Sequence, residues 1–381
     1  MVVAANFLVV AARMSLVTFL GIYFVRKAGI DLATVGVALL LENVLRGVLA
    51  PMFGALSDRV GRRALLIAAA LVTAAVLPCF LLVRGPASLF AWSVAIGVAG
   101  AVNMPVANAL LLDLAPSERR QGVLAINYTV MSVAYTLGVM PAGYVAEQGY
   151  GLLALMSTTG FLMVALLYAL ALRGALPLEQ RAGGSFLVHT LSAMHDRAFL
   201  AFASLGFVFP LGMGLVVIVS PLFAAEIGLG EGYIGLVLGG NSIIVALLAV
   251  PVATRIEPLG PFRLLGVAAM IVAAAFACYG AIPSPAAALL VGTVVFSFAE
   301  LVFSSAVPAA VAHLAPAGRR GAYQGSWALV GSFSMGSALV VSGVLRDAIG
   351  WHGAWLFYAG LILGAALLLF ATRDWFSRVG Q

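Results

Sequence analysis

The chain is short of charge, because Asp, Glu, Lys and Arg together make up only 9% of its 381 residues. Soluble globular domains carry about 25% charged residues. Hydrophobic residues, in contrast, reach 63% of this chain. It therefore lacks the side chains needed to cover an ordinary aqueous surface, and the composition indicates a protein embedded in lipid.

Several other absences exclude whole classes of function. The chain has two cysteines, Cys79 and Cys278, and both lie inside apolar stretches. Two cysteines are too few for a disulfide framework, and their spacing is not that of metal ligands. The four histidines do not cluster, and a single lysine leaves no phosphate-binding loop of the Gly-x-x-x-x-Gly-Lys type. The net charge of +6 is spread over short loops, unlike a nucleic-acid interface. We expect no metal, no cofactor, no ATP drive and no nucleic-acid partner.

What the chain has in abundance is long apolar runs. A helix needs about 20 mainly apolar residues to cross a bilayer, and twelve runs of this kind follow one another with short joints between most of them. They cover residues 4–25, 34–54, 64–83, 88–112, 122–146, 151–172, 198–224, 233–253, 264–283, 286–312, 321–344 and 353–372. The pattern predicts an all-α membrane protein with twelve transmembrane helices.

A repeat divides the chain into related halves. The sequence Leu-Ala-Pro-Ser-Glu-Arg-Arg at 114–120 recurs as Leu-Ala-Pro-Ala-Gly-Arg-Arg at 314–320, and the one long joint lies midway. We predict two pseudo-symmetric six-helix bundles, residues 1–172 and 198–381, connected by a linker at 173–197. In transporters built from repeats, the substrate site lies where the repeats meet. Because one chain holds both halves, we expect a monomer.

Arginine placement predicts the orientation in the membrane. Most of the 20 basic residues fall in loops on one side of the predicted spans, including Arg62, Arg120 and Arg320. Cytoplasmic loops carry this excess. The expected location is the inner membrane, with both termini in the cytoplasm.

Four ionisable side chains fall near the middle of predicted spans: Arg13, Glu42, Arg46 and Glu300. Each costs about 2.5–3.5 kcal/mol there, so each is a candidate functional residue. Glu42 and Arg46 are one helical turn apart and can pair, and Arg13 falls at a similar depth on the neighbouring span. Two interpretations remain open. The three form a structural cluster that pins the first two spans, or a residual positive charge faces a central cavity and attracts an anionic group.

Glu300 is predicted to carry protons, together with Glu42. The span 286–312 contains no Arg or Lys, and burial favours the neutral form of such a carboxyl. The alternative is a neutral carboxyl hydrogen-bonded between helices. Further polar residues are predicted to line a substrate cavity with Arg13 and Arg46, although each could instead form an interhelical hydrogen bond. They are Asn43, Asn103, Asn127, Tyr128, Asn241, Gln324 and Trp327.

The loop at 54–63 reads Gly-Ala-Leu-Ser-Asp-Arg-Val-Gly-Arg-Arg. A basic turn alone does not require two glycines and an aspartate at this spacing. The stretch resembles the signature loop of the major facilitator superfamily, Gly-x-x-x-Asp-Arg-x-Gly-Arg-Arg. The resemblance implies secondary transport by alternating access and a conformational latch, in which Arg62 pairs with Asp113 and Asp58 contacts the eleventh span. The implied latch residues are Gly54, Asp58, Arg59, Gly61, Arg62 and Asp113.

The stretch Gly138-Val-Met-Pro141-Ala-Gly143 resembles the Gly- and Pro-rich motif of drug/proton antiporters. It lacks the glycine before the proline, and Ser93 stands where that branch usually has an arginine. The resemblance implies a proton-coupled exporter of apolar or amphipathic small molecules. One alternative is a proton-coupled importer of a small anionic solute bound by Arg13 and Arg46. Another is a membrane sensor or enzyme without transport, although no catalytic constellation is visible.

Overall fold

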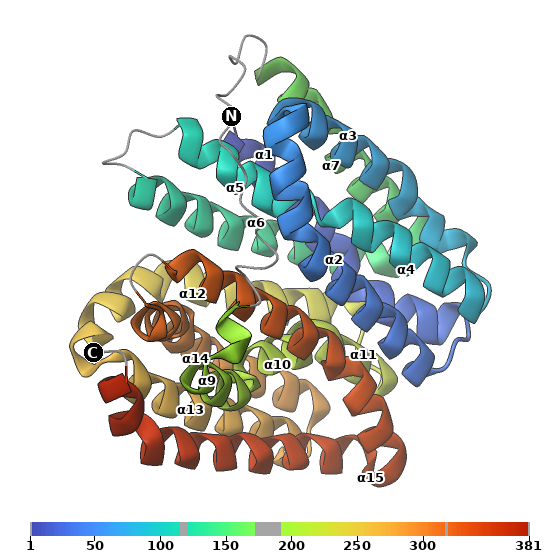
Figure 1. Cartoon of the computed structure of the whole chain (residues 1–381). Helices are drawn as coiled ribbons and strands as arrows, with labels where there is room; N and C mark the ends of the chain where they lie inside the picture. Colours follow the sequence, from blue (N-terminus) through green and yellow to red (C-terminus); the bar gives the residue numbers. More distant parts are fainter. Residues whose placement is uncertain (1, 115–119, 172–191, 317–318, 380–381) are drawn as a thin grey trace. The chain divides into compact units, whose positions relative to one another are not determined.

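The computed structural model describes residues 2–114, 120–171, 192–316 and 319–379, and every regular element in these ranges is a helix (Figure 1). The chain forms two compact units. The first comprises Met1–Phe186 and Gly230–Ser242, and the second comprises Leu187–Leu229 and Ile243–Gln381. Most of the predicted linker at 173–197 lies outside the described residues, so the predicted division of the chain there stays a prediction.

The first unit contains the helices from α1 to α7 and the beginning of α12. These helices are α1 (Val2–Ile22), η1 (Tyr23–Lys27), α2 (Leu32–Val60), α3 (Arg62–Val76), η2 (Leu77–Leu82), α4 (Pro86–Gly100), α5 (Asn103–Leu114), α6 (Arg120–Gln148) and α7 (Tyr150–Ala171). In this unit α1 packs against α6 and α7, and α2 packs against α4.

The second unit takes the rest of the chain. Its helices are η4 (Ser192–His195), α9 (Arg197–Gly206), α10 (Val208–Gly214), η5 (Leu215–Val219), α11 (Ser220–Glu226), the later part of α12 (Glu231–Ile256), η6 (Glu257–Leu259), α13 (Pro261–Ala281), α14 (Pro285–Leu314) and α15 (Arg320–Val379). Here α13 packs against both α14 and α15.

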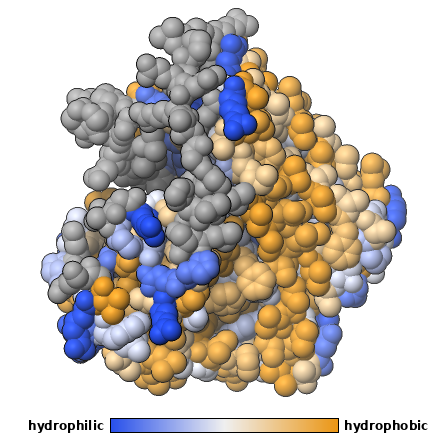
Figure 2. Space-filling model, in the orientation of Figure 1, coloured by the Kyte–Doolittle hydropathy of each residue, from blue (hydrophilic) through white to orange (hydrophobic). Residues whose placement is uncertain are grey.

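Ten segments of the described chain are long and apolar enough to cross a membrane. They are Val2–Lys27, Leu32–Ser57, Arg62–Leu82, Pro86–Leu111, Tyr150–Leu170, Arg197–Glu226, Glu231–Ile256, Pro261–Ala281, Pro285–Leu314 and Gly321–Val379. The last contains non-helical Gly350 between two helices, and α6 occupies the predicted fifth span. The number twelve stays a prediction. Figure 2 shows hydrophobic residues over much of the visible surface, as lipid-facing helices require.

Two local sequence features interrupt the helices of the first unit. Pro105 has no N–H, so the carbonyl of Ala101 receives no helical hydrogen bond, and the fourth span breaks into α4 and α5 at this point. Gly61 separates α2 from α3 with a φ of 90°, a conformation that favours glycine. The loop motif therefore places Arg62 at the first turn of α3.

Candidate functional site: a charge cluster within the spans of the first unit

Arg13 on α1 and Arg46 on α2 converge on one carboxylate. Arg13 Nη2 lies 2.9 Å from Glu42 Oε1, and Arg46 Nη1 lies 3.9 Å from the same oxygen. Arg46 also donates from Nη2 to Asn43 Oδ1 at 2.5 Å. The structure thus brings together four of the residues that the sequence singles out.

The cluster carries more positive than negative charge. The Glu42 side chain is 8% exposed, while those of Arg13 and Arg46 are 19% and 24% exposed. Asn43 donates its amide to the carbonyl of Leu39 at 2.9 Å, which orients its side-chain oxygen towards Arg46. Because one carboxylate faces two guanidinium groups, a net charge of about +1 remains inside the first unit.

Small residues on α4 make room for this cluster. A Cβ on Gly97 would lie 2.9 Å from the Glu42 carbonyl oxygen, so only glycine lets α4 approach the α2 backbone here. A Cβ on Gly100 would lie 3.6 Å from both Arg13 Nη1 and Arg46 Cδ.

Asn103 lies three residues beyond Gly100, at the start of α5. The break between α4 and α5 separates it from Gly100, and its side chain is buried, at 5% exposed. Its Oδ1 accepts no hydrogen bond within the described part of the chain. A buried acceptor without a partner costs about 1–3 kcal/mol.

Asn127 is engaged by other protein side chains. Asn6 donates to Asn127 Oδ1 at 3.0 Å, and Asn127 donates to Asn108 Oδ1 at 3.4 Å. Tyr168 donates in turn to Asn6 Oδ1 at 3.4 Å. The network joins α1, α5, α6 and α7, which is the interhelical alternative weighed for Asn127. Our sequence analysis missed Asn6 and Tyr168, because a lone polar residue in an apolar run does not reveal its partners.

The residues of the implied latch lie around the α2–α3 turn and the end of α5. Arg62 Nη1 lies 2.7 Å from Asp113 Oδ2, an ion pair without the alignment of a hydrogen bond. Arg59 is exposed, and Gly54 is half-buried. The side chain of Asp58 lies outside the described residues, so its predicted contact stays a prediction.

The glycines of the fifth-span motif serve close helix contacts in the first unit. A Cβ on Gly138 would lie 2.5 Å from the carbonyl oxygen of Ala11 on α1, and one on Gly143 would overlap the Glu231 carbonyl oxygen on α12. Pro141 lies inside α6 between them.

The remaining predicted residues are not brought to the charge cluster by any described contact. Gln324 donates to the Pro308 carbonyl at 3.0 Å, and the Trp327 ring packs 5.3 Å from that of Phe202, both within the second unit. Glu300 is half-buried on α14, and Asn241 is buried on α12. The side chain of Tyr128 lies outside the described residues.

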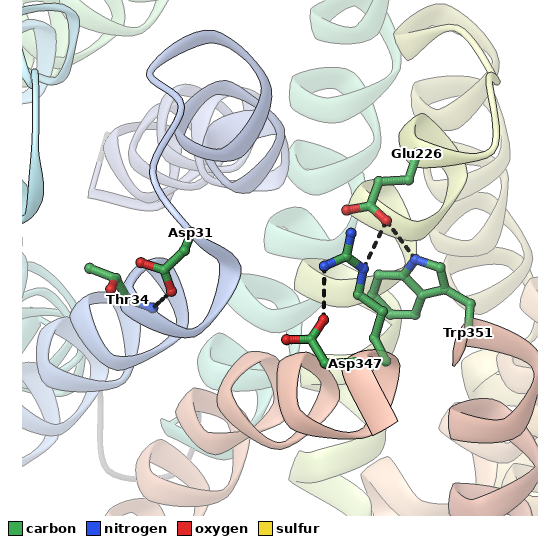
Figure 3. Close-up of polar contacts among 6 residues, drawn as sticks. Asp31, Thr34, Glu226, Asp347 and Trp351 are labelled. Atoms are coloured by element: carbon green, nitrogen blue, oxygen red, sulfur yellow. Dashed lines mark hydrogen bonds and ion pairs between the residues drawn. The ribbon is translucent and has the colours of Figure 1, made fainter. Parts of the chain in front are cut away.

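A second polar cluster, in the second unit, was missed by our sequence analysis. Glu226, the last residue of α11, accepts hydrogen bonds from Arg346 Nε at 3.1 Å and from Trp351 Nε1 at 2.7 Å (Figure 3). Arg346 also contacts Asp347 at 3.1 Å. The Glu226 carboxylate therefore fixes the end of α11 to the bend in α15.

Comparison with known proteins decides the family. The model of the Major Facilitator Superfamily matches residues 2–210 and 202–375, which is nearly the whole chain. The chain belongs to the Major Facilitator Superfamily. The predicted superfamily and the predicted all-α membrane fold are thereby confirmed.

Individual relatives in this superfamily differ in what they carry. The Na(+), Li(+), K(+)/H(+) antiporter of Planococcus maritimus is 26% identical to this chain, over 92% of the chain and 88% of the antiporter. Two solved structures share the fold. A POT family transporter in complex with 5-aminolevulinic acid has a TM-score of 0.78 at 13% identity, covering 99% of this chain and 96% of the transporter. The nucleoside transporter NupG has a TM-score of 0.76 at 17% identity, covering 98% of each chain.

Membership of the superfamily makes this chain a multi-pass membrane transporter and not an enzyme. The alternative of a sensor or enzyme without transport is therefore set aside. Which solute is carried, and in which direction, depends on the residues of this chain.

Proposed function

We propose that this member of the Major Facilitator Superfamily is a proton-coupled antiporter that exports apolar or amphipathic small molecules. The observation that carries the proposal is the Glu42 carboxylate, buried within a membrane span and contacted by Arg13 and Arg46. The relative named as an antiporter of alkali cations and protons supports the exchange mode.

The geometry gives Glu42 two distinct states. When ionised, it holds Arg13 at 2.9 Å and ties α1 to α2. A proton on Glu42 removes the negative charge from this pair and leaves two guanidinium groups facing each other without compensation. A ligand that binds one state better shifts the equilibrium between the two. Proton uptake and release at Glu42 would thus be linked to the relative positions of α1 and α2.

Glu300 on α14 is the second proposed proton carrier, and it lies in the other unit. Substrate contacts would come from Arg13, Arg46, Asn43 and Asn103, since Asn103 offers a buried acceptor without a partner in the described chain. The other polar residues predicted for the cavity are secondary candidates: Asn127, Tyr128, Asn241, Gln324 and Trp327.

The loop after α2 is proposed to act as a latch on the cytoplasmic side. The described contact of this latch is the ion pair between Arg62 and Asp113 at 2.7 Å. A conformational change can break and reform such a pair. The proposal places a monomer in the inner membrane with both termini in the cytoplasm, as the arginine distribution predicts.

Transport in sealed vesicles under an imposed pH gradient tests the antiport. Glu42→Gln and Glu300→Gln are expected to abolish gradient-driven export of a cationic dye while sparing downhill exchange. Asp347→Asn is the matched control, because this carboxylate is 71% exposed at a helix end. Full gradient-driven export by both Gln variants would overturn the proposal.

A second candidate function is import of a small anionic solute, favoured by the net positive charge of the cluster and the partial exposure of both arginines. The double variant Arg13→Gln/Arg46→Gln separates the two functions. Loss of anion uptake with intact export would support an anion site, whereas loss of dye export by a folded protein would assign the arginines to coupling.

A further inference from the structure

The beginning of α12 is held by a carboxylate from α6. Glu147 Oε1 accepts a hydrogen bond of 2.8 Å from the backbone N–H of Gly232, the second residue of α12. The first N–H groups of a helix have no acceptor within the helix, and a negative charge is favoured at this end. Glu147 therefore caps α12 from a different helix.

The contact between Glu147 and α12 requires glycine at two positions, because a Cβ there would crowd the carboxylate. A Cβ on Gly230 would lie 2.6 Å from Glu147 Oε1, and one on Gly232 would lie 3.1 Å from it. Further along the two helices, a Cβ on Gly235 would lie 2.9 Å from the Val139 carbonyl oxygen. The first half of α12 thus lies directly on the α6 backbone, and contact clustering assigns Gly230–Ser242 to the first unit.

The residues just before α12 are fixed to the other unit. Glu226 is held by Arg346 and Trp351 in the second unit, and the boundary between the units falls between Leu229 and Gly230. Only residues 227–230 separate the anchored Glu226 from the α12 segment that Glu147 holds. The Glu147 contact therefore lies close in sequence to the point where the chain passes from the second unit to the first.

Charged and titratable groups from three other elements meet at Tyr150, three residues after Glu147 in the sequence. Glu231 belongs to α12, Arg26 to η1 and Tyr150 to α7. The Glu231 carboxylate and the Arg26 guanidinium group are both within electrostatic reach of the Tyr150 hydroxyl. Of these groups, Glu147 is the one with a described hydrogen bond to the α12 backbone.

We propose that Glu147 is a proton-responsive clasp: ionised, it binds the α12 N-terminus to α6, and protonated, it releases the first half of α12. The proton is the ligand of this site, and on the predicted topology it would arrive from the outer side of the membrane. The clasp adds a third, peripheral proton site to the proposed transport cycle, and it can act whatever solute is carried.

Hydrogen–deuterium exchange on the full-length protein in nanodiscs tests the clasp without measuring transport. In the wild type, amides of 232–238 should exchange about two- to fivefold faster at about pH 3 than at about pH 7.5, after correction for intrinsic exchange, because protonation of a carboxylate in acid removes the charge–dipole attraction. Glu147→Gln keeps an oxygen that can accept the Gly232 N–H but carries no charge, so its exchange should show no pH response.

Two further variants complete the experiment. Glu231→Gln should keep the full pH response, because its carboxylate does not accept the Gly232 N–H. Gly143→Ala places a Cβ into the Glu231 carbonyl and should free α12 at every pH, which shows that the measurement detects release. A pH response that survives in Glu147→Gln, or one that disappears in Glu231→Gln, would overturn the assignment. An outcome against the clasp leaves the antiport test in vesicles unaffected, and the reverse also holds.

Discussion

The two units differ in what fills their interiors. The first unit places Arg13, Glu42 and Arg46 inside its spans and pairs Arg62 with Asp113 at the end of α5. In the described part of the second unit, the ion pair of Arg346 with Glu226 lies instead at the end of a span.

Aromatic rings take the place of charge in the second unit. Trp355, 1% exposed, stacks on Tyr279 with ring centroids 4.6 Å apart and meets Phe223 at 5.6 Å. Such rings interlock by shape and do not change with pH. The difference indicates that aromatic packing stiffens the second unit, whereas the first unit also contains ion pairs within its spans.

The largest expected effect is the loss of the aromatic core. Trp355→Ala should lower the free energy of unfolding by about 3–5 kcal/mol, because it removes a buried ring and leaves a cavity. Unfolding of the purified protein in mixed micelles measures the loss. Trp375→Ala is the matched control, since that ring is 42% exposed and its loss should cost far less. Equal losses would show that the second unit is not held by its interior rings.

The next largest effect is expected from breaking the charge cluster of the first unit. Glu42→Gln leaves two arginines without their carboxylate and should cost about 3 kcal/mol of unfolding free energy. The triple variant Arg13→Met/Glu42→Leu/Arg46→Met should recover most of that stability, because apolar replacements of buried ion pairs are often neutral, yet it should not transport. A triple variant that still transports against a gradient would show that the cluster has only a structural role.

A smaller effect is expected where helices of the first unit touch. Gly138→Ala should cost about 2 kcal/mol, because its Cβ meets the Ala11 backbone and the helices must separate. Gly21→Ala is the control, since no atom beyond its chain neighbours and its own helix backbone would lie within 4 Å of the added Cβ, and it should be neutral or slightly stabilising. Thermal unfolding distinguishes the two, and equal melting temperatures would contradict the close α1–α6 contact.

The smallest effect concerns the entry to α2, where Asp31 accepts a hydrogen bond from the Thr34 N–H at 2.9 Å (Figure 3). Hydrogen bonding by Thr34 lowers the pKa of Asp31 below its ordinary value. The stabilisation is therefore present above the ordinary Asp pKa of about 3.9 and is lost as the pH falls through the lower folded value.

Asp31→Ala should then cost about 1 kcal/mol at neutral pH, and the difference from the wild type should shrink in acid. Asp31→Asn keeps a capping side chain that does not titrate, so its stability relative to Asp31→Ala should hold in acid. Unfolding measured at several pH values checks both. A difference between wild type and Asp31→Ala that is independent of pH would exclude the carboxylate as the cap.

Sequence analysis reached the cluster but not its full set of contacts. The spacing of Glu42 and Arg46 and the depth of Arg13 follow from helix geometry alone, so their meeting was predictable. The hydrogen bond from Arg46 to Asn43 was not predictable, because it depends on how the Asn43 amide is oriented by its hydrogen bond to the Leu39 carbonyl.

Tertiary partners explain most of the other differences. For Asn127 the sequence left a cavity position and an interhelical hydrogen bond open; it accepts from Asn6 and donates to Asn108 on other helices, and no local sequence pattern identifies such partners. The cap of Glu147 on Gly232 joins residues that are 85 positions apart.

Two short π-helical segments, η1 and η5, change the direction in which the side chains after them point. Each is a π-helical turn, Tyr23–Lys27 and Leu215–Val219, and such a turn accommodates one extra residue. Since one residue corresponds to about 100° of rotation in an α-helix, removing one from η5 would swing Glu226 away from both Arg346 and Trp351. The direction of the Glu226 side chain, which anchors the residues before α12, thus depends on the π-helical turn η5, seven to eleven residues earlier in the chain.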